Sequence, residues 1–327
     1  MWGQEQFRLQ EREENSQGIA DEICELNPVL FEIRDWFLEI VNMPELALNT
    51  ALEICFLIAL DLDGTTLNSA KHISARTRHA LEAAAKQGVH IVVATGRPFA
   101  ALPKDVFEIE AIRYMLTSNG AAITDLKSGE IFYENCLSPK TVEATVAMLQ
   151  DTEYILEGFI AGKAYIEKDY YEYVQRTRTS FRDVNYILET RNPVENLCGF
   201  LLAHREHVEN INVNFEDMSC KPALRELLLT LPDATITTSF KNNLEIGGPT
   251  TSKAEALRQL GKKLGITREE MMAAGDSPND IAMLQEAGIA VVMGNGEEEV
   301  KAIADYITSD NDHDGVGEAV EKFVLNR

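Results

Sequence analysis

Five short apolar runs set the strongest limit on what this 327-residue chain can fold into. Their hydrophobic residues stand at consecutive positions instead of alternating with polar ones, and helix-like stretches separate the runs. A strand of this composition is buried on both faces, as in a parallel sheet that helices cover on each side. The runs span residues 54–60, 89–94, 114–117, 271–274 and 289–293. The sequence therefore predicts an α/β fold with a doubly wound parallel sheet.

The stretches between these runs carry signals for the start and the end of a helix. Residues 74–87 begin with a serine suited to N-capping and end before Gly88, a residue type that commonly ends helices. Further on, Ser277 and Pro278 combine a cap residue with a proline at the first helical position, and Gly288 is the predicted end. Each helix joins two apolar runs, so the sequence predicts two βαβ units.

The stretch between the two units differs in character. It contains a predicted helix over 139–150 and a predicted short strand over 235–238, with no phosphate-binding or carboxylate motif. Neither flanking half holds a complete sheet by itself. We therefore expect residues 53–137 and 241–327 to form one Rossmann-like core, into which residues 138–240 are inserted as an α/β cap.

Residues 1–52 are predicted to form a helical N-terminal extension. Apolar residues recur there with a 4-3-4-3 spacing from Ile19 to Ile40, although Pro28 must kink or break the helix. An apolar helical face favours docking on the core or on a second subunit, so we expect homo-oligomer contacts. Size-exclusion chromatography with light scattering tests this hypothesis: if it is wrong, the full chain and a chain starting at Met43 have the same oligomeric state.

The charge balance limits the partners of the chain. There are 53 acidic and 30 basic side chains, a formal net charge of −23, and no run of lysine and arginine, so nucleic acids and anionic membranes would be repelled. Five scattered cysteines without a CxxC pair indicate reduced thiols, and no secretory leader is recognisable. The longest apolar run is far shorter than the ~20 residues that cross a bilayer. The sequence therefore predicts a cytoplasmic protein.

Two acidic motifs follow apolar runs and lie at the predicted active edge of the sheet. The motif DLDGT contains Asp61 and Asp63, and GDSPND contains Asp276 and Asp280. Ligands of open α/β sheets bind at the carboxyl ends of the strands, and carboxylates brought together there repel one another unless a cation or a proton is present. Either motif alone could be an acidic helix start. Together they bring up to four carboxylates to one edge, which predicts a Mg²⁺ site.

Two further features supply positive charge and hydrogen-bond donors. Thr95, Gly96 and Arg97 follow the second apolar run and offer a hydroxyl group and a glycine whose backbone can approach a ligand closely. Lys253 lies in the predicted first turn of a helix, where the helix dipole disfavours a cation. This position suggests a functional task more than a solvated surface lysine.

The ordered set of motifs resembles the haloacid dehalogenase (HAD) superfamily of phosphotransferases. The shared motifs are DLDGT at 61–65, Thr95-Gly96, Lys253 and GDSPND at 275–280. Shorter motifs resemble Cof-type phosphatases of subfamily IIB, whose α/β cap is inserted between the second and third motifs: NGA at 119–121, LEI at 244–246, GI at 265–266 and DGV at 314–316. The resemblance covers about 54–323. Thr66 departs from the pattern, which usually has an aliphatic residue there.

The resemblance implies a role for each matched residue. Asp61 would be the nucleophile that forms an aspartyl-phosphate, and Asp63 would be the general acid/base. Mg²⁺ would be held by the side chains of Asp61 and Asp276 and the backbone carbonyl of Asp63, with Asp280 bound directly or through water. The remaining candidates are Thr95, Gly96 and Lys253 for phosphate binding, and Arg97, Asn119 and Asn279 as accessory residues.

These features predict a Mg²⁺-dependent phosphatase for a small phosphorylated metabolite, with a sugar phosphate as the first candidate and nucleotide, flavin and pyridoxal phosphates as further candidates. The aspartate at position 63 favours phosphate esters, because the resemblance implies that dehalogenases and phosphonate hydrolases lack it. Two alternatives stay open: a phosphomutase of the same superfamily, and a non-catalytic binding or scaffold protein that retains the fold. In the cap, Arg176 and Arg178 could reach a second anionic group on the substrate, although surface arginines need no such role.

Overall fold

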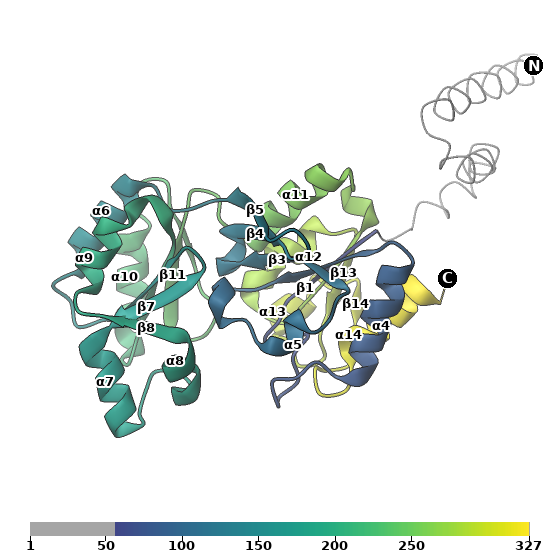
Figure 1. Cartoon of the computed structure of the whole chain (residues 1–327), viewed down its shortest axis with the longest axis horizontal. Coiled ribbons are helices and arrows are strands. Elements are labelled where there is room, and N and C mark those ends of the chain that lie inside the picture. The colour runs from purple at the N-terminus through teal and green to yellow at the C-terminus, as the bar shows by residue number, and fades with distance from the viewer. Residues whose placement is uncertain (1–55, 327) are drawn as a thin grey trace, which may run out of the picture. The chain divides into compact units, whose positions relative to one another are not determined.

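The computed structural model describes residues 56–326, which build two β-sheets with helices packed against them (Figure 1). The predicted N-terminal helix and its oligomer contacts, together with Cys24 and Cys55, lie outside the described residues. No helix within residues 56–326 is long and apolar enough to cross a membrane. Cys136, Cys198 and Cys220 are free thiols.

The larger sheet has eight strands in the order β14-β13-β12-β1-β2-β3-β4-β5. Neighbouring strands run parallel from β14 to β3, and β4 and β5 add antiparallel pairs at one edge. The strands are β1 (Leu57–Leu60), β2 (His90–Ala94), β3 (Ile112–Thr117), β4 (Ala122–Asp125), β5 (Glu130–Glu134), β12 (Met271–Gly275), β13 (Ile289–Val292) and β14 (Tyr306–Ile307). The five apolar runs correspond to β1, β2, β3, β12 and β13, and the predicted doubly wound α/β fold is confirmed.

Both faces of this sheet are buried, which explains why its strands read as continuous apolar runs. Ile58 and Leu60 of β1 belong to a core cluster with residues of α4, α5 and α14, whereas Leu57 and Ala59 belong to a second cluster with α11, α12 and α13. The helices are α4 (Ala75–Lys86), α5 (Lys104–Phe107) and α14 (Gly315–Val320) on one face, and α11 (Lys253–Leu264), α12 (Ile281–Glu286) and α13 (Glu298–Lys301) on the other.

The helices of this core begin at the capping residues that the sequence indicates. The hydroxyl oxygen of Ser74 accepts a hydrogen bond from the Thr77 amide at 3.1 Å at the start of α4. Gly88, just beyond this helix, has a φ of +88°. Ser277 precedes a short 3₁₀ turn, Pro278–Asp280, that leads into α12. Local chemistry therefore defines where the chain leaves each strand and enters each helix.

The second sheet lies between β5 and α11 in the sequence and has the order β10-β11-β9-β6-β7-β8. Its strands are β6 (Ile155–Ile160), β7 (Lys163–Glu167), β8 (Arg191–Val194), β9 (Val208–Asn214), β10 (Thr235–Thr237) and β11 (Asn243–Gly247). Its helices are α6 (Pro139–Leu149), α7 (Lys168–Thr177), α8 (Val184–Thr190), α9 (Leu197–Ala203) and α10 (Lys221–Leu228) (Figure 1). Apolar residues of α6, α9 and α10 share a core cluster with this sheet. We call this part of the chain the cap.

The position of β11 corrects one expectation from the sequence. Residues from 241 onward were expected in the core, but β11 is hydrogen-bonded between β9 and β10 of the cap sheet. The backbone groups of β11 are thus paired within the cap, and the chain returns to the core only after this strand. A five-residue strand does not show in its sequence which of two sheets it joins, since its partners are distant in sequence.

Candidate active site

Three carboxylates and one lysine meet at the carboxyl ends of β1 and β12. Asp61 follows β1, while Asp276 and Asp280 follow β12, the neighbouring strand. One oxygen of each of these three carboxylates lies within 4.8 Å of the others. Lys253 Nζ donates to Asp61 Oδ1 at 2.5 Å and to Asp280 Oδ1 at 2.6 Å. The structure therefore brings together these four predicted residues, which we call the carboxylate cluster.

Burial dominates the electrostatics of the carboxylate cluster. Lys253 is 1% exposed, Asp61 5% and Asp280 0%. Burial and the charge of Asp280 raise the pKa of Asp61 well above its usual range, and the same two causes raise the pKa of Asp276 to about 6. Burial lowers the pKa of Lys253, but Asp280 and Asp61 outweigh this effect and raise it, so the lysine stays protonated. One lysine does not balance three carboxylates, and this donor set fits a hard divalent cation.

Small residues allow the two acidic loops to approach each other. Gly64 has a φ of +82°, and a Cβ atom there would lie 2.5 Å from Asp276 Oδ2. Thr65 Oγ1 donates to Asp276 Oδ1 at 2.8 Å. Thr66 is buried, and its hydroxyl donates to the Asp61 carbonyl at 2.5 Å, a bond that an aliphatic side chain cannot make. Both threonines of the DLDGTT sequence thus hold acidic residues in place.

Asp280 is oriented by the start of its own helix. Its Oδ2 accepts hydrogen bonds from the backbone amides of Asp276 and Ser277 at 3.0 and 3.1 Å. Gly275 leaves room for this arrangement, since a Cβ atom there would lie 2.6 Å from Asp280 Cβ. One oxygen of Asp280 therefore closes the turn, while the other binds Lys253.

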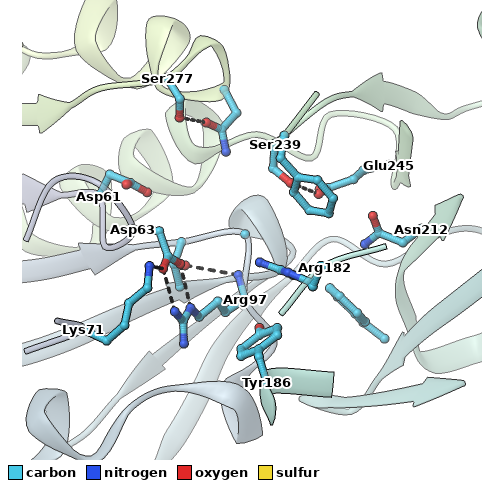
Figure 2. A pocket seen from close by; sticks show the side chains of 15 residues that line it. Asp61, Asp63, Lys71, Arg97, Arg182, Tyr186, Asn212, Ser239, Glu245 and Ser277 are labelled. Carbon is cyan, nitrogen blue, oxygen red and sulfur yellow. Dashed lines mark hydrogen bonds and ion pairs between the residues drawn. The ribbon is translucent and has the colours of Figure 1, made fainter. Parts of the chain in front are cut away.

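The side chain of Asp63 does not belong to the carboxylate cluster. Its oxygens accept from Arg97 Nε and Nη2 at 2.7 and 2.6 Å, and Lys71 Nζ lies 3.4 Å away (Figure 2). Burial alone would raise the pKa of Asp63, but the hydrogen bonds and charge of Arg97 lower it to about 2. Asp63 is therefore ionised near neutral pH in this arrangement, and Arg97 is its main partner.

Three loops at the ends of β2, β3 and β12 are joined by short polar contacts. Thr95 is buried, and its Oγ1 accepts from the Arg97 amide at 3.1 Å. The Asn119 amide donates to the Thr95 carbonyl at 3.0 Å, and Asn279 Nδ2 donates to Asn119 Oδ1 at 3.2 Å. A Cβ atom on Gly96 would lie 3.1 Å from Asn119 Oδ1. Asn119 therefore lies beside Thr95, Gly96 and Asn279, and Thr95 connects this group to Arg97.

A cavity of about 330 Å³ opens between these loops and the cap (Figure 2). Its core lining is Asp61, Asp63, Lys71, Thr95, Gly96, Arg97, Ser277 and Asn279. Its cap lining is Phe159, Arg182, Tyr186, Asn212, Ser239, Phe240 and Glu245. None of these cap residues is among the site residues that the sequence predicts, although Glu245 lies in the LEI motif at 244–246. Arg176 and Arg178, the arginines considered from the sequence, do not line the cavity.

One face of the cap sheet is polar, and the sequence contained a signal for it. In β9, Asn210, Asn212 and Asn214 alternate with Ile211 and Val213, so the asparagines share one face and the apolar residues pack in the cap core. Glu157 and Glu245 of the neighbouring strands pair in register with Asn212. Period-two alternation over 208–214 predicts such a face, but it does not show what the face covers.

Glu245 links the cap to the core. Its carboxylate accepts hydrogen bonds from Asn119, Ser239 and Asn243, the last at 2.8 Å. Asn119 belongs to the core loop after β3, and Ser239 belongs to the cap. Burial raises the pKa of Glu245, and its hydrogen-bond donors oppose this shift. Both oxygens of the carboxyl group thus accept hydrogen bonds from protein donors.

A doubly wound sheet with clustered carboxylates and a lysine at its carboxyl edge, beneath an inserted cap, defines a phosphoryl-transfer enzyme. The family model of haloacid dehalogenase-like hydrolases matches residues 58–320. The chain belongs to this family.

Individual relatives agree with this assignment. Phosphatase YwpJ of Bacillus subtilis is 32% identical over 277 residues, which cover 80% of this chain and 96% of the relative. The 5-amino-6-(5-phospho-D-ribitylamino)uracil phosphatase YcsE of the same organism is 30% identical over 277 residues, which cover 82% of this chain and 96% of the relative. The solved structure of a HAD subclass IIB sugar phosphatase is 26% identical and superposes with a TM-score of 0.67. The match covers 82% of this chain and 98% of that structure. The chain is a HAD-type phosphatase of the Cof type, subclass IIB, which sets aside the non-catalytic alternative.

Proposed function

We propose that this phosphatase is Mg²⁺-dependent and hydrolyses a small phosphorylated metabolite, in the first place a sugar phosphate, through a phosphorylated Asp61. The arrangement of the carboxylate cluster carries the proposal: a buried carboxylate at a strand end, held by Lys253 and facing the cavity. The polar face of the cap sheet supports a hydroxylated substrate. The similar solved structure is that of a sugar phosphatase.

The metal would be held by Asp61, Asp276 and Asp280, with the backbone carbonyl of Asp63 as a further oxygen ligand. These groups offer the hard oxygen donors that Mg²⁺ prefers. Burial and the charge of Asp280 raise the pKa of Asp276 to about 6, and a bound cation would favour its ionised form, which supports this assignment. A bound cation would neutralise charge on the transferring phosphoryl oxygens.

In the first step a carboxylate oxygen of Asp61 attacks phosphorus, and the bond from phosphorus to the leaving oxygen breaks as protonated Asp63 donates its proton to that oxygen. Thr95 and Gly96 donate hydrogen bonds to the phosphoryl oxygens, while Lys253 offsets the charge that surrounds Asp61. In the second step water attacks the same phosphorus atom, Asp63 accepts its proton, and Asp61 is restored as inorganic phosphate leaves. Two easier steps replace one difficult displacement.

Asp63 would act first as the acid that protonates the leaving group and then as the base that accepts a proton from water. The contact with Arg97 favours only the base. A carboxylate with a pKa of about 2 can accept a proton from water, but near neutral pH it has none to donate to a leaving group. We infer that Asp63 leaves Arg97 and takes up a proton when substrate is bound. Arg97 then maintains the ionised form between turnovers.

The test is phosphate release from p-nitrophenyl phosphate and a panel of phosphorylated sugars and other metabolites. Mg²⁺ should support turnover, a chelator should stop it, and Asp61→Asn should lower kcat at least about 10³-fold, the scale of losing a nucleophile. Asp105→Asn, in the same core but outside the cavity lining, is the matched control and should keep its activity.

The outcomes separate the alternatives. Activity that survives the chelator or the Asp61→Asn substitution contradicts the mechanism. Isomer formation without net phosphate release identifies a phosphomutase. A panel in which no sugar phosphate is hydrolysed contradicts the proposed substrate class.

A further inference from the structure

Three cationic side chains line the cavity, and two of them are already paired. Arg97 and Lys71 both contact the carboxylate of Asp63, at 2.6 and 3.4 Å. The third, Arg182, lies in the cap between α7 and α8. It forms no hydrogen bond and no ion pair with any residue that the structure describes. Its guanidinium N–H groups are therefore available to a ligand in the cavity.

Aromatic rings hold Arg182 in place. The central guanidinium carbon lies 4.3 Å from the centroid of the Tyr186 ring and 4.7 Å from that of Phe240. Both distances are typical of cation–π contacts, in which the ring face attracts the guanidinium charge. Such a contact uses none of the N–H groups as a hydrogen-bond donor to a carboxylate or carbonyl oxygen. Tyr186 is itself fixed by two further arginines, with Arg97 at 5.0 Å and Arg191 at 4.7 Å from its ring. The cap thus presents a positioned guanidinium with unused donors.

Within residues 56–326 no carboxylate forms an ion pair with this guanidinium, although its charge helps to lower the pKa values of Asp63 and Glu245. Glu245 lines the same cavity, but its oxygens already accept from Asn119, Ser239 and Asn243. Asp63 is held by Arg97. Figure 2 shows Arg182 reaching from the cap toward the side of the cavity where Asp63 and Arg97 lie. A substrate with its phosphate against Asp61 would therefore extend its leaving group toward Arg182.

We propose that Arg182 binds a second anionic group, a carboxylate or a second phosphate, on the leaving group of the substrate. A planar guanidinium with free N–H groups matches the two oxygens of either anion. The inference rests on the proposed function and narrows its substrate class to phosphorylated sugar acids and sugar bisphosphates. Arg182 is then a specificity-determining residue outside the carboxylate cluster.

Matched substrates test the proposal. 6-Phosphogluconate and glucitol 6-phosphate differ only by a carboxylate in place of a hydroxymethyl group, and fructose 1,6-bisphosphate and fructose 6-phosphate differ by one phosphate. The wild type should show a higher kcat/KM for the additional anion in at least one pair. Arg182→Gln should lower that kcat/KM about 10- to 100-fold, the range of hydrogen bonds to a charged group, and should change kcat/KM for the partner less than about threefold.

Two further variants sharpen the result. Arg182→Lys keeps the charge but loses the planar fork, so its kcat/KM should fall between those of the wild type and Arg182→Gln. Arg176→Gln removes an exposed arginine of α7 outside the cavity and should leave both pairs unchanged. The pair that responds identifies the anion. Equal losses for both members of a pair, or no preference in the wild type, would overturn the proposal.

Binding measurements separate this inference from the proposed function. If the wild type hydrolyses no phosphate ester with Mg²⁺, the proposed function fails. The same four compounds titrated calorimetrically into the wild type and Arg182→Gln still decide the role of Arg182. Tighter binding of the compound with the additional anion, lost in Arg182→Gln, supports it, and equal affinities overturn it.

Discussion

Replacing Lys253 with methionine tests how the carboxylate cluster is held together. Methionine is also unbranched and flexible, so it removes the charge with little change in shape. In the wild type, Lys253 Nζ lies 2.5 Å from Asp61 Oδ1 and 2.6 Å from Asp280 Oδ1. All three side chains are buried. The substitution therefore leaves two buried carboxylates without their shared cation.

The magnitude follows from this burial. Removing one partner of a buried ion pair costs about 3–5 kcal/mol of unfolding free energy. We expect the lower end, about 3 kcal/mol, because Asp61 can take up a proton: burial and Asp280 already raise its pKa, and the loss of Lys253 raises it further. Mg²⁺ would replace part of the lost positive charge. Because Mg²⁺ binds preferentially to the folded state, it should restore at least about 1 kcal/mol of the unfolding free energy that Lys253→Met loses.

Urea unfolding followed by circular dichroism measures these differences, with each variant studied in a chelator and in Mg²⁺. Lys262→Met is the matched control, because Lys262 is an exposed lysine of the same helix, and it should change stability by no more than about 0.5 kcal/mol. A loss below about 1 kcal/mol for Lys253→Met in chelator would refute the reasoning. So would a loss that Mg²⁺ leaves unchanged.

Two further predictions concern the loops of the site. Gly64→Ala should lower kcat at least tenfold, because the new methyl group would lie 2.5 Å from Asp276 Oδ2. Gly129 also has a positive φ, but a Cβ atom there would have no atom within 4 Å, so Gly129→Ala should lower stability and leave kcat unchanged. The same kcat for both variants would contradict the role of Gly64. Arg97→Gln removes the partner that lowers the pKa of Asp63 from 3.8 to about 2. The contact stabilises the fold above about pH 4, and this stabilisation is lost as the pH falls toward 2 and Asp63 takes up a proton. Its size is less than ~1 kcal/mol, because the Asp63 side chain is 37% exposed to solvent. The difference in urea stability between wild type and variant should therefore shrink from pH 5 to pH 2, and a growing difference would contradict the assignment.

Much of the core could be predicted from sequence because its determinants are local. A strand buried on both faces must be apolar throughout, and Ser74 caps an amide only three residues away. The strand ends then place Asp61 and Asp276 at one edge, since parallel neighbours end on the same side of a sheet. The carboxylate cluster follows from topology and motif order, without any knowledge of side-chain packing.

The cap could be predicted only in outline. Its residues are selected by contacts between strands far apart in sequence, so no local pattern distinguishes a side chain that lines the cavity from one at the surface. Arg176 and Arg178 are exposed, whereas Arg182 faces the cavity. The membership of β11 in the cap sheet likewise depends on its pairing with β9.

The sequence by itself determined the class of core, the edge at which the chemistry occurs and the residues of the carboxylate cluster, because apolar patterning, helix caps and strand order act within short segments. Only the tertiary structure decided that Asp63 pairs with Arg97, that Glu245 binds Asn119 and that Arg182 packs on Tyr186 without an ion pair to any described carboxylate. These contacts join residues from separate loops and from both sheets. The charge state of a side chain depends on the groups around it in space, and chain order does not specify those groups.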